Sequence, residues 1–492
     1  MAEAHAVKRT GSTLDLRPVL TILGFLICGT GVLMIVPAMF DLATGSGSEA
    51  FEVAAAVALG LGVMLITANR GCGPLTTLRQ TYLLTFLAWL LVPGVAALPL
   101  VFSSLQMTFT DAFFETMSGM TTTGSTVLIG LDELAPSVLL WRGLLQWVGG
   151  LGIIVMAIAI MPLLRSGGMQ LFHAESSDRS DKPLARVSQL AFSLCAVYFG
   201  LTVVCAFAYR LAGMTWFDAA VHSMTTLSTG GYSNHDASFG YFASASIDWI
   251  AIVFMLAGAV PFLLILRAAR GDGASLVHDQ QVRIMLLVAL LTAAALAVPL
   301  VAQRDIPIDQ AVREAAFNVT SILTTTGFAS TDYGTWGPFA TATFFYLMFI
   351  GGCTGSTSGA IKIFRFQVLY IVLSSYTLHR FTPHLVISRT YGDKPLSQDV
   401  AEGVMAFLAL YFATVGLIAV VLGALGLDWL TALSGAVQAV GNIGPGLGEA
   451  IGPAGNFAGL PDGAKWALVA GMLSGRLELF TVLVVLTPSF WK

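Results

Sequence analysis

Long apolar segments separated by short polar links run through almost the whole chain. Stretches of about 20 apolar residues recur, and each is long enough to cross a bilayer as a helix. We expect spans at about 18–41, 50–69, 80–103, 138–165, 188–212, 246–268, 280–302, 337–378 (broken), 401–426 and 463–487. Only 11% of the 492 residues are charged, against about one quarter in soluble domains. The pattern predicts an all-α polytopic membrane protein.

Shorter apolar segments lie between the two spans of each later pair. Segments of ~10–14 residues cannot cross a bilayer and suit re-entrant helices, which must be surrounded by protein or a water-filled cavity. We therefore expect a leading helix pair followed by four helix–pore-loop–helix repeats around one pseudo-fourfold pore. The predicted divisions are 1–79 for the N-terminal tail and leading pair, and 80–187, 188–279, 280–398 (with a broken second helix) and 399–492 for the four repeats.

These four short segments share one pattern. Aligned without gaps, DAFFETMSGMTTTGST, DAAVHSMTTLSTGGYS, EAAFNVTSILTTTGFA and TALSGAVQAVGNIGPG place a glycine at the same offset: Gly124, Gly231, Gly327 and Gly444. Each segment begins with a residue typical of a helix N-terminus, namely Asp111, Asp218, Glu314 or Thr431. A repeat at a fixed period indicates an array of similar modules.

The residues around each glycine are candidates for a cation filter. A short helix that enters from outside points the negative end of its dipole at the axis. Carbonyl groups beyond it can line a pore, and glycine allows the backbone angles that this needs. Carbonyl coordination suits a weakly hydrated monovalent cation better than a divalent one. The predicted lining residues are Thr122, Thr123, Gly124 and Ser125; Thr229, Gly230, Gly231 and Tyr232; Thr325, Thr326, Gly327 and Phe328; and Asn442, Ile443, Gly444 and Pro445. The alternative is that glycine and threonine merely permit close helix packing.

Charge predicts the orientation. Lys and Arg cluster in the N-terminal tail and in the links at 70–79, 165–186, 267–283 and 380–394. The stretches 41–52, 126–138 and 231–248 carry Asp or Glu but no Lys or Arg. By the positive-inside rule, the basic links and both termini are cytoplasmic. The four filter loops then open toward the external side.

Enzymatic chemistry has no support in the sequence. The seven histidines and five cysteines show no metal-type spacing, and neither a nucleophile set nor a nucleotide-binding loop is present. We expect no enzyme activity, no cofactor held by this chain and no nucleic-acid partner. A secondary transporter of another monovalent cation, Na⁺ or ammonium, remains an alternative, because broken helices and midplane sites also occur in that class.

The motifs resemble those of a known family. TTTGST, STGGYS, TTTGF and NIGPGLG, together with WRGLLQWVGGLGIIV, GGCTGSTSGAIKIFR and SGRLELFTVLV, are similar to the Trk/Ktr/HKT superfamily of potassium transporters, and most similar to the bacterial Trk-type membrane subunit (TrkH or TrkG). The resemblance implies K⁺ as the transported ion, bound at the filter residues. It also implies a homodimer in the lipid of the bacterial inner membrane, gated by a cytosolic TrkA-type subunit that binds ATP, ADP or NAD. The link at 166–187 and Pro261 depart from the family pattern, which leaves the docking of that subunit open. Coupling to protons or sodium also stays open.

Two features within the spans are candidate gates. The stretch Gly351–Gly359 is too rich in glycine to stay helical, since each Gly costs ~1 kcal/mol relative to Ala. We interpret it as a loop that blocks the pore beneath the filter and is anchored by Lys362. Arg476 lies in the last span, where a charge is functional by default, and we interpret it as an electrostatic barrier. The predicted gate residues are Gly351, Gly352, Thr354, Gly355, Ser356, Gly359, Lys362 and Arg476.

Each gate candidate also has a structural alternative. The glycine-rich stretch can be a small-residue packing interface, and Arg476 can form an ion pair between helices with Glu478. Arg142, Gln146 and Trp147 share one helical face. For these three residues, contact with a pore helix or with the lipid interface competes with a role in transport.

Overall fold

Helices form nearly all of the regular structure in the computed structural model. It describes residues 14–45, 49–159, 183–384, 388–392 and 394–491. The middle of the link at 166–187 lies outside these ranges. The leading pair is α1 (Arg17–Thr44) and α2 (Ala50–Ala68). The first repeat contains α3 (Leu78–Ala96), α4 (Leu98–Phe102), α5 (Phe109–Met120), η1 (Leu131–Glu133) and α6 (Pro136–Ala159).

The next three repeats follow the same order of long helix, short helix, loop and long helix. The second contains α9 (Pro183–Leu211), α10 (Trp216–Leu227), η2 (Ser238–Tyr241), α11 (Ala245–Ala259), α12 (Phe262–Ala269) and α13 (Gly273–His278). The third contains α14 (Gln280–Arg304), α15 (Ile308–Leu323), η3 (Tyr333–Trp336), α16 (Pro338–Leu347), α17 (Ile363–Phe381), and the antiparallel strands β1 (Thr390–Tyr391) and β2 (Lys394–Pro395). The fourth contains α18 (Gln398–Ala424), α19 (Trp429–Gly441), η4 (Phe457–Gly459), α20 (Asp462–Arg476), α21 (Phe480–Leu486) and α22 (Pro488–Trp491).

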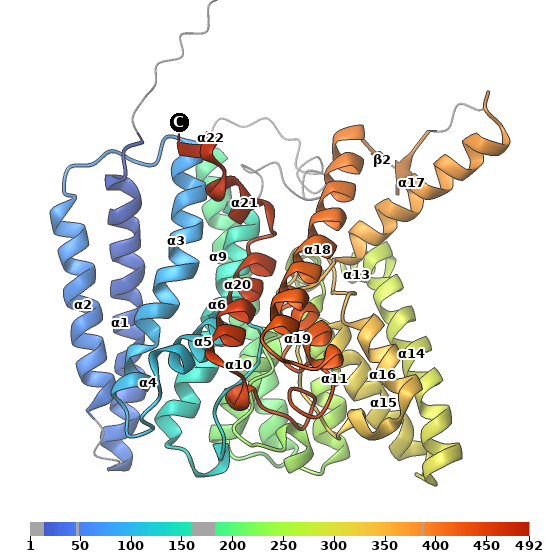
Figure 1. Ribbon diagram of the computed structural model, residues 1–492, viewed down its shortest axis with the longest axis horizontal. Coiled ribbons are helices and arrows are strands. Elements are labelled where there is room, and N and C mark those ends of the chain that lie inside the picture. Colours follow the sequence, from blue (N-terminus) through green and yellow to red (C-terminus); the bar gives the residue numbers. More distant parts are fainter. Residues whose placement is uncertain (1–13, 46–48, 160–182, 385–387, 393, 492) are drawn as a thin grey trace, which may run out of the picture.

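The long helices run side by side, with the short helices among them (Figure 1). The pair α1 and α2 lies at one side of the bundle, and α14, α15 and α16 lie at the other. The C-terminal α22 lies at the same end as the link between α2 and α3. Among the described residues, seven helices are long and apolar enough to cross a membrane, or up to nine if two bent helix pairs each count as one span. The chain is therefore a multi-pass membrane protein.

Two of the expected spans are bent, which the sequence analysis did not predict. The span expected at 246–268 is divided into α11 and α12, which meet at 106°. Pro261 lies within the break, between Ala259 and Phe262, and proline has no N–H to continue the helical ladder. The span expected at 463–487 is divided into α20 and α21 at 110°. Glu478 and Leu479 have positive φ at that bend, which a right-handed helix cannot accommodate. The break expected within 337–378 is present between α16 and α17.

The short helices also begin earlier than expected. Their first residues are Phe109, Trp216, Ile308 and Trp429, rather than Asp111, Asp218, Glu314 and Thr431. Threonine caps the first two, as the Thr108 hydroxyl accepts from the N–H of Asp111 at 3.2 Å. The Thr215 hydroxyl does the same for Asp218 at 3.0 Å. Each aspartate therefore lies within the first turn, where its charge complements the helix dipole.

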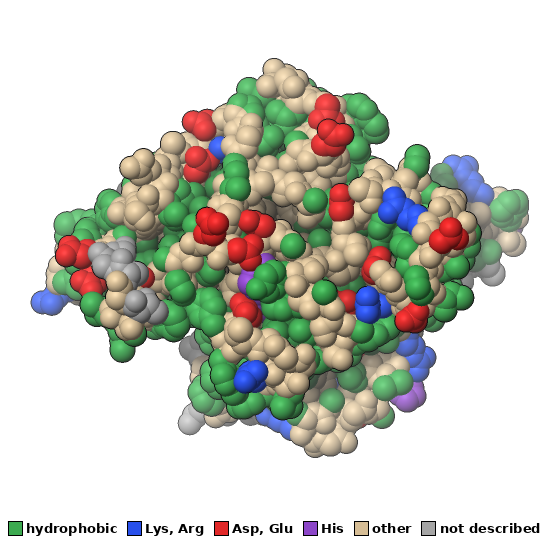
Figure 2. Space-filling view, turned by 90° about the horizontal axis from the view of Figure 1, so that it is seen from below, with side chains coloured by type: hydrophobic (Ala, Val, Ile, Leu, Met, Phe, Trp, Pro, Cys, Tyr) green, Lys and Arg blue, Asp and Glu red, His purple; other side chains and the backbone are tan. Residues whose placement is uncertain are grey.

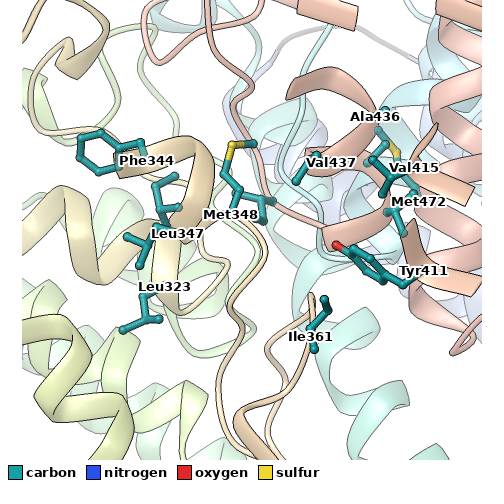
Figure 3. Close-up of a cluster of buried hydrophobic side chains, with 14 of the residues drawn as sticks. Leu323, Phe344, Leu347, Met348, Ile361, Tyr411, Val415, Ala436, Val437 and Met472 are labelled. Carbon is teal, nitrogen blue, oxygen red and sulfur yellow. The ribbon is translucent and has the colours of Figure 1, made fainter. Parts of the chain in front are cut away.

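A hydrophobic cluster joins the third and fourth repeats. Met348 and Ile361 come from the two ends of the segment between α16 and α17, and they lie between side chains of α16 and side chains of α18, α19 and α20 (Figure 3). Tyr411 and Val437 are fully or almost fully buried there. This packing holds the segment 348–362 in the interior, close to the ends of the short helices.

Candidate functional site: four filter loops and the loop beneath them

All four short helices end in the same hydrogen-bonded turn. The N–H groups of Thr123, Gly230, Thr326 and Ile443 donate to carbonyls five residues earlier, at 2.8, 2.9, 2.8 and 2.9 Å. This bond defines the Schellman motif, in which the residue after the helix adopts the left-handed conformation. The repeat seen in the sequence is thus a repeat of backbone geometry.

The left-handed residue that ends each Schellman turn is not the glycine that the sequence analysis emphasised. It is the residue two positions earlier, with φ of 51° at Thr122, 51° at Thr229, 59° at Thr325 and 52° at Asn442. Asparagine tolerates this conformation, but a β-branched threonine is strained there. Such strain is retained where the surroundings and the function demand it.

The four glycines form a closed ring of backbone contacts. A Cβ at Gly124 would overlap the carbonyl oxygen of Gly230, and one at Gly231 would overlap that of Thr326. A Cβ at Gly327 would lie 2.7 Å from the nitrogen of Gly444. A Cβ at Gly444 would lie 3.4 Å from the carbonyl oxygen of Gly124, which closes the ring. Each loop therefore touches its neighbour through main chain, and at Gly124, Gly231 and Gly327 the contact leaves no room for a side chain.

Most carbonyl groups of this ring have no hydrogen-bond donor. Twelve carbonyls belong to residues 122–124, 229–231, 325–327 and 442–444. Across the described parts of the chain, side chains donate to only two of them: Gln146 to Gly230 at 2.6 Å, and Ser125 to Gly444 at 2.8 Å. Buried carbonyls are normally paired, so the remaining ones are available to a cation. Gly230 and Gly444, both among the predicted ion ligands, already accept a side-chain hydrogen bond.

The fourth loop differs from the other three. Gly124, Gly231 and Gly327 have φ of 93°, 79° and 87°, whereas Gly444 is outside the left-handed region. Gly444 precedes Pro445, and the residue before a proline is restricted to extended conformations. The ring is thus pseudo-fourfold in contact but not in backbone conformation.

A buried network fixes the first two loops. The Arg142 guanidinium pairs with Glu115 at 2.8 Å and donates to the carbonyl of Ser233 at 2.8 Å. The Gln146 amide donates to Gly230 and accepts from the N–H of Tyr232 at 3.0 Å. Arg142 and Gln146 therefore contact a pore helix and a filter loop, rather than the lipid interface. Trp147 bonds the hydroxyl of Thr202 on α9 at 3.1 Å, outside this network.

An outer cavity of about 80 Å³ lies against the ring. All four aligned glycines line it, together with His235 and Asp236. The surrounding face carries Asp and Glu side chains gathered around its centre (Figure 2). Such charges raise the local concentration of cations.

His235 joins the loops after the first and second filters. It bonds Asp132 at 2.5 Å and approaches Asp218 to 3.4 Å. Burial alone would lower the pKa of His235, but hydrogen bonds to Asp218 and Asp132 outweigh burial and raise this pKa above its usual value.

The loop between α16 and α17 bonds the base of the filter directly. The N–H of Gly359 donates to the Thr325 hydroxyl at 2.7 Å, and the Ser358 hydroxyl lies 3.3 Å from the same group. The Thr357 hydroxyl lies 3.2 Å from that of Thr229. The N–H of Ala360 donates to the carbonyl of Gly441 at 2.8 Å. Two filter loops and the end of the short helix α19 are thus bonded to one segment.

The same loop is anchored at the break between α11 and α12. The N–H of Cys353 donates to the carbonyl of Ala259 at 2.9 Å, and that of Thr357 donates to Gly258 at 3.3 Å. The Lys362 ammonium donates to the carbonyls of Ser358 at 2.5 Å and Ser356 at 3.3 Å. These contacts place Lys362 as an anchor of the loop.

The glycines of the loop allow neighbouring main-chain segments to approach closely, as well as a non-helical conformation. A Cβ at Gly351 would overlap the carbonyl of Gly359, and one at Gly352 would lie 2.8 Å from that of Ala259. A Cβ at Gly359 would overlap the carbonyl of Gly441. A Cβ at Gly355 would instead meet only Pro261, at 3.8 Å, and Gly355 has a φ of 85°. Small-residue packing and a loop conformation therefore occur together, so the two interpretations of this stretch are not exclusive.

Arg476 and Glu478 do not pair with each other. Arg365 forms an ion pair with the Glu478 carboxylate at 2.5 Å, and the Arg365 guanidinium lies 3.7 Å from the centroid of the Phe407 ring. Arg476 lies at the end of α20, is 5% exposed, and donates from Nη1 to the carbonyl of Thr357 at 3.0 Å. Its Nε and Nη2 have no acceptor among the described residues. Arg476 and the loop line an inner cavity of about 50 Å³, which Asn442 of the fourth filter also lines.

Comparison with known proteins identifies the family. Residues 73–492 match the family model of TrkH, described as a cation transport protein. The chain belongs to the TrkH family. It is 48% identical to the Trk system potassium uptake protein TrkI of Halomonas elongata over 446 residues, which cover 89% of this chain and 90% of that protein. It is 37% identical to the Trk system potassium uptake protein TrkH of Escherichia coli over 488 residues, 97% and 99% of the two chains.

A solved structure shows the same fold. The crystal structure of the potassium transporter TrkH from Vibrio parahaemolyticus matches with a TM-score of 0.89 at 35% identity, covering 97% of this chain and 100% of that chain. The resemblance noted in the sequence and the all-α, four-repeat fold class are confirmed.

Sequence reasoning missed three residues in this TrkH-family site. Thr357 and Ser358 carry the side-chain contacts to the filter, although the predicted set skipped them between Ser356 and Gly359. Their hydroxyl groups, visible in the sequence, were a usable signal for contact with the threonines of the filter. Arg365 was missed as the partner of Glu478, and its contact spans 113 positions of the sequence.

Proposed function

We propose that this chain takes up K⁺ through the ring of four filter loops. The observation that supports this most is the closed ring of main-chain contacts, in which most carbonyls have no donor. Carbonyl oxygens that replace a hydration shell are the basis of K⁺ conduction. Relatives that are similar over almost their full length carry the name potassium uptake protein.

The site favours a monovalent cation on chemical grounds. The filter residues 122–125, 229–232, 325–328 and 442–445 contain no carboxylate, whereas Ca²⁺ sites usually recruit carboxylates and Mg²⁺ sites keep several waters. Among the described residues, no group of three or more His, Cys, Asp or Glu could hold a metal ion. Na⁺ and ammonium remain the alternative substrates, and the test below separates them from K⁺.

The loop 351–359 and Arg476 act as the gate of this pathway. The loop bonds the base of two filter loops and the end of α19, and the guanidinium adds positive charge next to it. A cation that leaves the filter must displace the loop and pass that charge. Opening therefore requires the loop to release Thr229 and Thr325.

The protein works in the bacterial inner membrane, with both termini in the cytoplasm. The basic links support this orientation through the positive-inside rule, and the acidic outer face agrees with it. The family resemblance supports a homodimer with one K⁺ path in each protomer. It also supports control by a cytosolic nucleotide-binding subunit of the TrkA type, because this chain has no nucleotide-binding loop.

Complementation tests the proposal. A bacterium without K⁺ uptake systems should grow on low K⁺ only when it expresses this chain. In proteoliposomes, excess K⁺ should compete with ⁸⁶Rb⁺ uptake, whereas equal Na⁺ or ammonium should compete far less. Uptake that Na⁺ or ammonium suppresses as well as K⁺ would favour the alternative substrate.

A further inference from the structure

The inner cavity holds more positive than negative charge. Lys362, Arg365, Arg476 and Glu478 line it. Arg365 forms an ion pair with Glu478, the only carboxylate in that lining, and Lys362 donates hydrogen bonds to loop carbonyls. Arg476 therefore has no carboxylate partner in the described parts of the chain. Burying a charge without a counter-charge costs free energy, so an anion in the cavity would be stabilising.

The cavity also has hydrogen-bond donors with no acceptor. They include Nε and Nη2 of Arg476 and the hydroxyl of Thr354. The main-chain N–H groups of Gly355, Ser356 and Ser358, which also line the cavity, donate to no acceptor among the described residues. Six donor atoms without an acceptor among the described residues therefore belong to residues that line the cavity, and two of them are on the cationic side chain of Arg476. Gly355 and Ser356 are consecutive, and successive free main-chain N–H groups are a common anion-binding element.

We propose that the inner cavity binds one small inorganic anion of the size of chloride, held by Arg476, Thr354 and main-chain N–H groups of the loop. The volume of about 50 Å³ accommodates such an ion with a little water. It is too small for an organic anion such as gluconate. The cavity offers hydrogen-bond donors and a cationic side chain, whereas the filter offers carbonyl acceptors, and this difference sets the two sites apart.

The anion would stabilise the closed arrangement of the gate, and the charge of Arg476 acts as the barrier to a cation when the anion is absent. Its ligands come from the loop at 354–358 and from the end of α20, so binding joins the two elements that must separate for conduction. The inference rests on the proposed function only for the role of the cavity in the ion pathway. Binding itself is independent of K⁺ transport, and the test measures binding.

Thermal unfolding of the purified full-length chain tests the site. The melting temperature is measured in detergent at constant K⁺, with chloride or bromide replacing gluconate. Arg476→Gln removes the unpaired charge, and Thr354→Val removes one donor while keeping the side-chain shape and the N–H bond to Gln281. Arg380→Gln is the matched control, because Arg380 is an exposed cation on α17 outside the cavity.

Chloride and bromide should raise the melting temperature of the wild type and of Arg380→Gln equally. Arg476→Gln should lose the shift, and Thr354→Val should need roughly tenfold more chloride for half of it, as expected when one hydrogen bond to an ion is lost. Bromide-soaked crystals should show an anomalous peak beside Arg476. An absent shift in the wild type, an unchanged shift in Arg476→Gln or Thr354→Val, or a missing peak would overturn the proposal. If Arg476→Gln does not fold, Thr354→Val and the peak decide.

Discussion

The two cavities on either side of the filter differ in almost every property. The outer one is lined by residues of all four loops, with Arg142, His235 and Asp236. The inner one is lined by Lys362, Arg365, Arg476 and Glu478, and by residues 354–356 and 358–360 of the loop. In the function proposed above, the outer cavity attracts a cation and the inner cavity resists its exit, so selection and gating are separate tasks.

The difference extends to how each region is built. The filter depends on short-range bonds within each repeat, which recur four times. The inner region depends on single contacts between the second, third and fourth repeats, such as Thr229 with Thr357. A contact that is repeated four times tolerates a divergent sequence in one copy, as the fourth loop shows. In the inner region each contact depends on one side chain, so point substitutions should affect the inner region and the filter differently.

Removing the charge of Arg476 should have the largest effect. Repulsion between unit charges at ~4 Å is about 4 kcal/mol at an effective dielectric of 20 and about 1 kcal/mol in bulk water. Arg476→Ala should therefore raise basal ⁸⁶Rb⁺ flux into proteoliposomes by roughly one to three decades, at ~1.4 kcal/mol per decade. The K⁺/Na⁺ ratio should be mostly kept, because the filter is untouched.

Two further variants distinguish an effect of the Arg476 charge from a structural role of Arg476. Arg476→Lys keeps the charge and should stay close to the wild type. Glu478→Ala frees Arg365 and should not reproduce the rise caused by Arg476→Ala. If Arg476→Ala and Glu478→Ala both abolish uptake in folded protein, Arg476 has a structural role and the barrier assignment is wrong.

Substitution in the ring should change ion choice instead of gating. Gly231→Ser or Gly327→Ser places a side chain where the neighbouring main chain leaves no space. The displaced carbonyls should lower K⁺/Na⁺ discrimination roughly tenfold, the effect of about 1.4 kcal/mol. Competition of Na⁺ with ⁸⁶Rb⁺ uptake measures the change.

Gly337→Ser is the matched control for this experiment. Gly337 also has a positive φ, 100°, but nothing lies within 4 Å of its absent Cβ. The control therefore carries backbone strain without the clash, and its ion choice should equal that of the wild type. Unchanged discrimination in both ring variants would contradict the filter assignment.

The sequence supplied the outer region more fully than the inner one. The gap-free alignment of the four copies predicted which glycines lie close together, because each copy carries its own glycine at the same offset. The left-handed threonines were not predicted, since propensity argues against threonine in that conformation. The bend at 477–479 lacks any proline or glycine, so no local signal marks it. The pairing of Arg365 with Glu478 depends on tertiary packing, which a single sequence does not reveal.

The hydrogen bonds between loop and filter should have a smaller effect than the charge. Thr325→Val removes the acceptor of the Gly359 N–H and the contact with Ser358. A neutral hydrogen bond contributes about 0.5–1.5 kcal/mol, so loop release should raise basal flux by up to roughly tenfold. Thr414→Val is the control, because the Thr414 hydroxyl bonds only its own helix. Equal flux in Thr325→Val and wild type would show that the loop does not hold the filter through this contact.

Shortening the loop tests the same region without relying on one bond. Deleting a few residues within Gly352–Ser358 should raise basal ⁸⁶Rb⁺ uptake in vesicles without any partner protein, because fewer contacts with the filter remain. Lower uptake by a folded, dimeric variant would indicate that packing is the main role of the loop.

The outermost contact, between His235 and Asp132, should give the smallest effect. The pKa of His235 is raised in the folded protein, so the stabilisation is complete below the usual unfolded value of about 6.5. It is lost as the pH rises through the higher folded pKa. Asp132 is 43% exposed on its side chain, and such pairs contribute about 0.2–1 kcal/mol. Asp132→Asn should therefore lower the melting temperature by a few degrees at most below pH 6, and by less at alkaline pH. Glu133→Gln, at an exposed acid without an ion pair in the described structure, should leave the pH profile unchanged. A pH profile of Asp132→Asn identical to the wild type would mean that His235 is held by Asp218 alone.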